Sequence, residues 1–302
     1  MKRMINIYTP LIFSFLLFFC SNPETKKENT TTKTIVKSIE KHPKFNEYWY
    51  AGKAEITSYT LSQVRYGEVH SGTAVTIFVT EDFLPKKQVK ADYQNDKNIP
   101  ILKLNSTKKF TTGIYPYSLM TSTFSPIAVN QKAIKISFSS QEWCGNTFVQ
   151  LNNKNNYQID FHSYFENNAD KKLTLKKHPL ENDFWNQLRI NPKSITKGRY
   201  KVIPSMEYLA LHHKEIKAYD AETNLIEKDG FQYFSVYYPD LKRKITIKLT
   251  KEFPYSIEGW EETTHSRGKK LTTTATKIKT IKSAYWSKNG VADIEERKEL
   301  GL

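Results

Sequence analysis

The residue with the clearest chemistry in this 302-residue chain is Cys20, whose position predicts that its thiol carries a lipid. Two basic residues at positions 2 and 3 precede an apolar run from Ile5 to Phe19, which ends directly at this cysteine. This pattern is typical of a bacterial lipoprotein signal, in which the thiol is acylated and the cysteine becomes the mature N-terminus. Leu17 fits the usual pattern before such a cysteine, whereas Phe19 is bulkier than the small residue that normally precedes it.

The alternative for this segment is an uncleaved anchor, but its apolar run is shorter than the roughly 20 residues that a bilayer-spanning helix needs. We therefore predict a signal peptide over residues 1–20 and a membrane contact through acylated Cys20. Ser21 follows the cysteine, in place of the Asp that marks inner-membrane retention in well-studied envelopes. By that resemblance we expect a protein of the cell envelope, anchored at the outer membrane.

The second cysteine, Cys144, lies in the string Glu142-Trp143-Cys144-Gly145-Asn146, which resembles the Trp-Cys-Gly element of thioredoxins. The second cysteine of that element is missing, which excludes dithiol chemistry, and the nearby sequence supplies no base for a lone thiol nucleophile. We expect a small buried thiol at the end of a strand. Glu142, Trp143 and Asn146 still combine a charge, a stacking ring and an amide, so these residues with Cys144 are the candidate ligand-binding site.

Other reactive residue types do not form a recognisable constellation. On a strand, His212 and His213 would point to opposite faces and could not both bind one metal ion. Glu261 and Glu262 would alternate in the same way, which disfavours the paired carboxylates of a glycosidase. We expect no metal, no cofactor and no catalytic residue.

The chain is strongly basic, with a formal net charge of +15, which favours anionic partners. The densest basic stretch ends in Lys277, Lys279 and Lys282, a candidate contact for anionic lipid or glycan. The alternative is an edge strand that lysines protect from pairing with another sheet. We expect no specific nucleic-acid partner, and the sequence does not identify a protein partner.

Two kinds of sequence follow the signal. Residues 21–42 are rich in Lys, Glu, Asn and Thr and predict a disordered tether. Residues 43–302 predict a single β-rich domain, because apolar and polar residues alternate along many short segments, most clearly over Lys244–Thr250. The expected strands are Ala54–Leu61, Gly72–Thr80, Ile101–Leu104, Ile114–Phe124, Ile134–Ser139, Thr147–Leu151, Tyr157–His162, Lys172–Leu175, Tyr200–His212, Glu215–Glu222, Phe231–Tyr238, Lys244–Thr250, Tyr255–Thr264 and Thr272–Ile281.

Helical spacing interrupts this pattern once, where Leu180, Phe184 and Leu188 recur every four residues and predict an amphipathic helix over about 180–190. A short helix is expected near the C-terminus. The connections between the expected strands are short, so neighbours in sequence should pair antiparallel. We predict an all-β fold, an antiparallel meander that forms a curved sandwich or a partly open barrel.

The chain resembles uncharacterised bacterial envelope lipoproteins of similar length. The resemblance rests on the Cys20 signal and on the segments YWYAGKAEI (48–56), QEWCG (141–145), LRINP (188–192) and KTIKSAYW (279–286). Such proteins are sometimes labelled septum formation inhibitor Maf, a name that belongs to cytoplasmic α/β nucleotide pyrophosphatases. The Ser/Arg phosphate loop of those enzymes is missing from this sequence. The resemblance implies a lipid-anchored envelope protein and supplies no active site.

Taken together, these observations predict a lipid-anchored, non-catalytic binding or assembly module. The alternative is a periplasmic or surface hydrolase that acts on glycan, lipid or peptide. Its cleft would combine Glu142 and Cys144 with a histidine that the fold brings close.

Overall fold

The computed structural model describes residues 41–128 and 131–302. The predicted signal peptide and nearly all of the predicted tether lie outside the described residues. The described fold belongs to one compact unit, Ser38–Leu302, and the contacts described below are made within it. No helix in the described ranges has the length and apolar character required to cross a membrane.

The strands form one antiparallel sheet of 15 strands, so the all-β prediction is confirmed. Along the sheet the order is β10-β11-β12-β13-β14-β15-β1-β2-β4-β5-β6-β7-β8-β9, and β3 pairs with β2. The strands are β1 (Ala54–Arg65), β2 (Glu68–Leu84), β3 (Val89–Lys90), β4 (Ile99–Thr112), β5 (Tyr115–Pro126), β6 (Lys135–Glu142), β7 (Gly145–Asn153), β8 (Tyr157–Ser163), β9 (Lys171–Leu175), β10 (Gly198–Val202), β11 (Tyr219–Lys228), β12 (Phe231–Tyr238), β13 (Arg243–Thr250), β14 (Ile257–Ser266) and β15 (Lys269–Ser283).

Short helices lie at the ends of the described chain and in the links between strands. They are α1 (Phe45–Trp49), α2 (Glu181–Ile190), α3 (Met206–Leu211) and α4 (Ile294–Glu299), with 3-10 turns η1 (Glu166–Asn168), η2 (Pro192–Ser194), η3 (Tyr285–Ser287) and η4 (Val291–Asp293). The helix predicted over 180–190 and the short C-terminal helix are both present.

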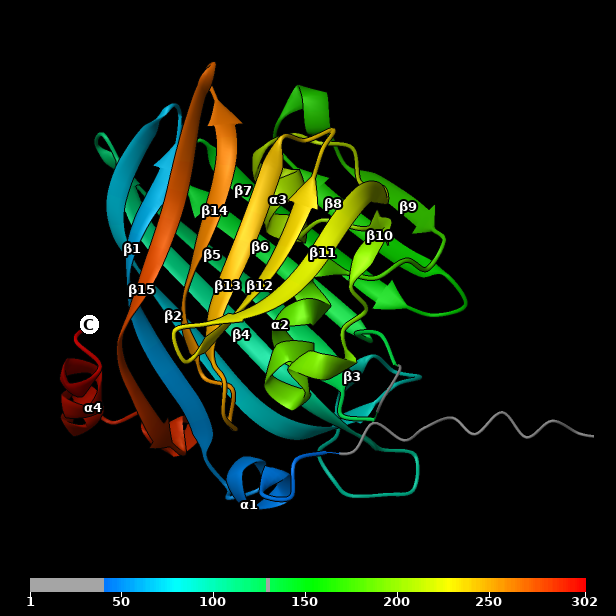
Figure 1. Ribbon diagram of the computed structural model, residues 1–302, viewed down its shortest axis with the longest axis vertical. Helices are drawn as coiled ribbons and strands as arrows, with labels where there is room; N and C mark the ends of the chain where they lie inside the picture. The colour runs from blue at the N-terminus through cyan, green and yellow to red at the C-terminus, as the bar shows by residue number, and fades with distance from the viewer. Residues whose placement is uncertain (1–40, 129–130) are drawn as a thin grey trace, which may run out of the picture. The chain divides into compact units, whose positions relative to one another are not determined.

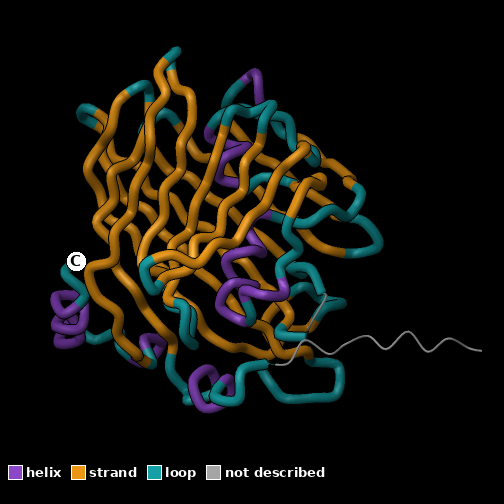
Figure 2. The backbone as a smooth tube through the Cα atoms, in the orientation of Figure 1, coloured by secondary structure: helices purple, strands orange, loops and turns teal. Residues whose placement is uncertain are grey.

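The chain runs through the sheet in two halves. From β1 it proceeds outward to the edge strand β9, then crosses to the opposite edge and returns from β10 to β15. There β15 pairs with β1, with Ala54 opposite Ser283. The crossing segment carries α2, and Figures 1 and 2 show α2 and α3 inside the curl, between the two halves of the sheet. The meander is thus one open sheet that curls around the segment between β9 and β10, which contains α2.

In most strands, the alternation of apolar and polar residues correctly predicts which side chains are buried and which are exposed. In β13, Ile245, Ile247 and Leu249 are buried while Lys244 is exposed, as predicted. Their buried side chains join one continuous core with Leu188 of α2 and other inward residues. Burial of this apolar surface is the main force that keeps the sheet curled.

Strand β1 differs from a strand with one buried and one solvent-exposed face, because both of its faces are buried. Ala54 and Ile56 pack outward against Leu300, beside α4. The polar residues Glu55 and Thr57 are buried as well, and Glu55 reaches Arg189 of α2. Alternation read from the sequence predicts a wet face for Glu55, whereas the curl of the sheet places it in the interior.

Two strand predictions are wrong in part. The segment Tyr200–His212 forms β10 only as far as Val202 and then turns into α3, where the Ser205 hydroxyl accepts a hydrogen bond from the Tyr208 amide as an N-cap. The segment Glu215–Glu222 becomes β11 only from Tyr219. His212 and His213 are therefore not strand neighbours: they follow α3, and His213 has a φ of 50°.

Candidate functional site

Helix α2 is tied to the sheet by polar side chains along its whole length. Its first residue, Glu181, pairs with Arg243 of β13, and Arg189 near its end pairs with Glu55 of β1. Between them, Asn186 donates to the Leu102 carbonyl at 3.0 Å and to the Ser125 hydroxyl at 2.8 Å. The acid at the start and the base at the end also complement the helix dipole. The spacing of its apolar residues predicts the apolar side of this helix, whereas its buried polar side has no signal in the local sequence.

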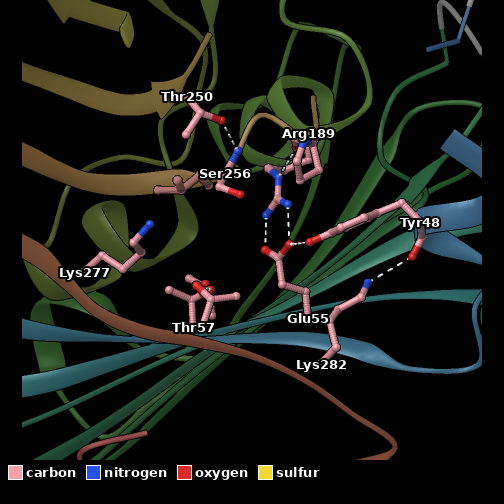
Figure 3. A network of polar contacts seen from close by, with 12 residues as sticks. Tyr48, Glu55, Thr57, Arg189, Thr250, Ser256, Lys277 and Lys282 are labelled. Atoms are coloured by element: carbon pink, nitrogen blue, oxygen red, sulfur yellow. Dashed lines mark hydrogen bonds and ion pairs between the residues drawn. The ribbon is translucent and has the colours of Figure 1, made fainter. Parts of the chain in front are cut away.

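The Arg189–Glu55 pair is bidentate and almost completely buried, with nitrogen–oxygen distances of 2.5 and 2.7 Å (Figure 3). The guanidinium also lies 4.9 Å from the ring centre of Trp49 and 4.7 Å from that of Phe78. The Tyr48 hydroxyl donates to the same carboxylate. Burial alone would raise the pKa of Glu55, but the contact with Arg189 outweighs it and holds this pKa below its usual value.

A second buried network lies at the other end of α2. Arg243 donates to both oxygens of Glu181, at 2.5 and 2.7 Å, and its Nε donates to Glu262 at 2.6 Å. Tyr238 completes the shell of Glu181 with a hydroxyl donor at 2.8 Å. One guanidinium therefore binds two carboxylates in the interior, and the positive charge of Lys108 also helps to lower the pKa of Glu262. Glu262 points inward and Glu261 outward, so they are not a catalytic pair.

The open side of α2 borders a cavity of about 640 Å3, which we call the α2 cavity. Its walls come from the end of β5 and the described residues that follow it, the segment before α2, α2 with η2, and β10 with the residue Thr196 before it. The described lining residues are Lys41, Pro126, Ile127, Ala128, Gln131, Lys132, His178, Pro179, Asp183, Phe184, Gln187, Ile190, Asn191, Ser194, Ile195, Thr196, Tyr200 and Lys201.

Asp183 lies at the buried wall of the α2 cavity, where its carboxyl group joins α2 to the β5–β6 connection. Its oxygens accept from the Ser125 hydroxyl at 2.5 Å, the Ala133 amide at 3.1 Å and the Gln187 amide at 2.7 Å. Burial raises the pKa of Asp183 to about 6, although these donors oppose the shift. Protein donors thus occupy both oxygens of the carboxyl group, which holds α2 against β5 and the residues that follow it.

This raised pKa makes a specific contribution to the pH dependence of stability. Because the folded state holds the proton more tightly than the unfolded chain, the contribution of Asp183 to stability is complete below about pH 4 and is lost as the pH rises through about 6. The shift corresponds to about 3 kcal/mol. In Asp183→Asn this contribution should be missing, so the unfolding free energy of wild type relative to the variant should fall by most of that amount between pH 4 and pH 6.

Urea unfolding of both proteins at closely spaced pH values measures this difference. Asp160→Asn, at a half-exposed site on β8, is the matched control and should leave the pH profile unchanged. A constant difference between wild type and Asp183→Asn from pH 4 to pH 6 would contradict the assignment.

The site predicted from sequence lies elsewhere, at the hairpin turn between β6 and β7. Cys144 is exposed there, which corrects the expectation of a buried thiol. Its amide donates to a Glu142 oxygen at 2.7 Å, and hydrogen bonding to Glu142 raises the pKa of its thiol. Trp143 is 69% exposed and lies beside Tyr115, with a centroid distance of 6.2 Å. Asn146 follows as an exposed residue at the start of β7.

The three lysines of the basic stretch do not form one patch. Lys277 pairs with Glu258, Lys279 is exposed, and Lys282 lies over the Tyr48 ring and donates to the Tyr48 carbonyl at 3.0 Å (Figure 3). The alternative of an edge strand is wrong, because β15 lies between β14 and β1. Their role as an anionic contact stays a prediction.

Within residues 41–128 and 131–302, no group of three His, Cys, Asp or Glu side chains is placed to hold a metal ion. The fold and the α2 cavity define a class only: an open antiparallel β-sheet protein whose internal helix borders a small-molecule-sized cavity. Comparison of the chain with family models, curated proteins and solved structures found no match.

Proposed function

We propose that this protein is a non-catalytic binding module of the cell envelope, held at a membrane by acylated Cys20, and that its ligand occupies the α2 cavity. The observation that carries the binding role is the cavity itself. Its volume of about 640 Å3 falls within the roughly 300–1,000 Å3 typical of small-molecule sites. Its lining joins buried apolar side chains, among them Ile127 and Phe184, to a larger number of polar ones, so a ligand could be held there by both kinds of contact.

The structure favours this role over the hydrolase alternative. A thiol nucleophile needs a lowered pKa, whereas the carboxylate of Glu142 raises the pKa of Cys144. The cavity in turn presents Asp183, whose oxygens are already occupied by protein donors.

Blocking the cavity from its solvent side tests the binding role. Thr196 is exposed and lines the α2 cavity, so Thr196→Trp should place an indole in it without disturbing the core. Thr174→Trp, on exposed β9 outside the lining, is the matched control. We expect wild type to bind one equivalent of the fluorescent probe 1-anilinonaphthalene-8-sulfonate, and Thr196→Trp to bind it about tenfold more weakly. Equal affinity for wild type and Thr196→Trp would refute the proposed site.

Metabolic palmitate labelling tests the anchor independently. The full chain should incorporate label, and Cys20→Ala should lose it, because only the Cys20 thiol follows the predicted signal. Equal labelling of the two chains would show that Cys20 is not the lipid site.

A further inference from the structure

The α2 cavity is lined by two chemically different kinds of side chain. Ile127, Phe184, Ile190 and Ile195 give it an apolar wall, and all of them are buried. Lys41, Lys132 and Lys201 line it as well, and these cations are exposed or half-buried. A ligand that satisfies both kinds has an apolar body and a polar end.

The net charge of the described lining residues is positive. Asp183 is the acidic residue among the described lining residues; its carboxylate lies at the buried wall and offsets part of the charge of Lys132, but the three lysines of the lining outnumber it. Lys201 pairs with Asp220 at 3.0 Å, in a contact that is half-exposed and easily exchanged. Among the described residues no ion pair joins Lys41 or Lys132 to a carboxylate.

The lowered pKa of His178, which lines the cavity, is consistent with this positive charge. Burial lowers its pKa, and Lys176, Lys201 and Lys132 lower it further. These lysines are therefore close enough to repel a proton on His178, and an anion at the same place would be attracted by all of them.

Resting on the binding role proposed above, we propose that the α2 cavity binds an amphipathic anion. Its alkyl or ring body lies against Phe184 and the isoleucines, and its carboxylate, phosphate or sulfate group is held by Lys132 and Lys201. The ion end remains near solvent, where lysine can bind it without desolvating a charge pair completely.

The test compares ligands that share one alkyl chain and differ in the end group. Isothermal titration calorimetry on the chain from Ser21 onward, which contains every described residue, would use decanoate, decyl phosphate and uncharged 1-decanol below their aggregation concentrations. We expect both anions to bind about tenfold more tightly than decanol. The relative affinity of the two anions distinguishes a carboxylate from a phosphate ligand.

Charge-removing variants locate the contact. In the double variant Lys132→Gln/Lys201→Gln the affinity for the anions should fall roughly tenfold, and that for decanol should be unchanged. Lys109→Gln/Lys244→Gln removes two exposed charges on strands outside the cavity and should bind all three ligands as wild type does.

The outcomes separate this inference from the proposed function. Equal binding of decanol and the anions, blocked by Thr196→Trp, would keep the cavity as a binding site and overturn its preference for anions. Binding of none of the alkyl ligands would overturn both. A tenfold gain in decanoate affinity on removing residues 21–40 would make the chain's own segment the occupant and overturn the assignment of a free anion.

Discussion

Arg189→Met is expected to lower the free energy of unfolding by about 3–5 kcal/mol, because Glu55 would remain buried without its countercharge. The wild-type carboxylate has a pKa below its usual value through this contact, so the stability it contributes is present at neutral pH and is lost on acidification. Guanidinium chloride unfolding at pH 7 measures the cost.

Two variants show whether the cost comes from the stranded charge. Glu55→Leu/Arg189→Met removes both charges and should be clearly more stable than Arg189→Met, because an apolar pair of similar size can replace a buried ion pair. Arg199→Met breaks an exposed pair with Glu222 and should cost less than about 1 kcal/mol. If the double variant were as unstable as Arg189→Met, lost packing against Trp49 and Phe78 would be the cause, and the electrostatic account would be wrong.

Arg243→Met should be at least as damaging, about 3–5 kcal/mol, because it leaves the buried Glu181 without its countercharge and removes one of the cations that stabilise Glu262. Burial and mutual repulsion would raise their pKa values in the folded variant. The deficit of the variant relative to wild type should therefore be largest at pH 7 and smaller at pH 4.

The conservative replacement Arg243→Lys provides the comparison. Lysine keeps the charge but cannot donate to both oxygens of Glu181 and to Glu262 at once, so we expect an intermediate loss with little change in the pH profile. A deficit of Arg243→Met that stays constant from pH 4 to pH 7 would show that the two carboxylates are not the source of the instability.

Much of the fold could be predicted from local patterns. The strands around Lys244–Thr250 and Tyr157–His162 and the helix at Glu181–Ile190 have strong periodicity, and each is present. The error over Tyr200–His212 had a local signal, since Pro204-Ser205 followed by six non-Gly residues is a typical helix start.

The buried charges could not be predicted in the same way. Glu55 and Arg189 are 134 positions apart and meet only because the chain crosses the concave side of the sheet between β9 and β10. Alternation identifies one wet face per strand, but it cannot show that a helix covers the wet face of β1. The three strong ties of α2 at Glu181, Asp183 and Arg189 are therefore tertiary features.

The candidate site was missed for the same reason. The α2 cavity combines Lys41, residues 126–128, 131 and 132, and several residues between 178 and 201, and none of these stretches carries a chemical motif of its own. The segment around Cys144 looks like a candidate site because its rare residue types are adjacent in sequence. The hairpin turn leaves Cys144 exposed, and the segment does not line the cavity. Residue types within a short segment cannot predict a site whose residues come together only when the chain crosses between β9 and β10.

A crystal structure of the chain from Ser21 onward, grown with decanoate, would show directly whether the α2 cavity binds an amphipathic anion. Our account predicts electron density for one alkyl chain against Phe184 in the α2 cavity, with its carboxylate near Lys132. Density for the ligand beside Trp143 and Tyr115, with the α2 cavity holding water alone, would contradict it.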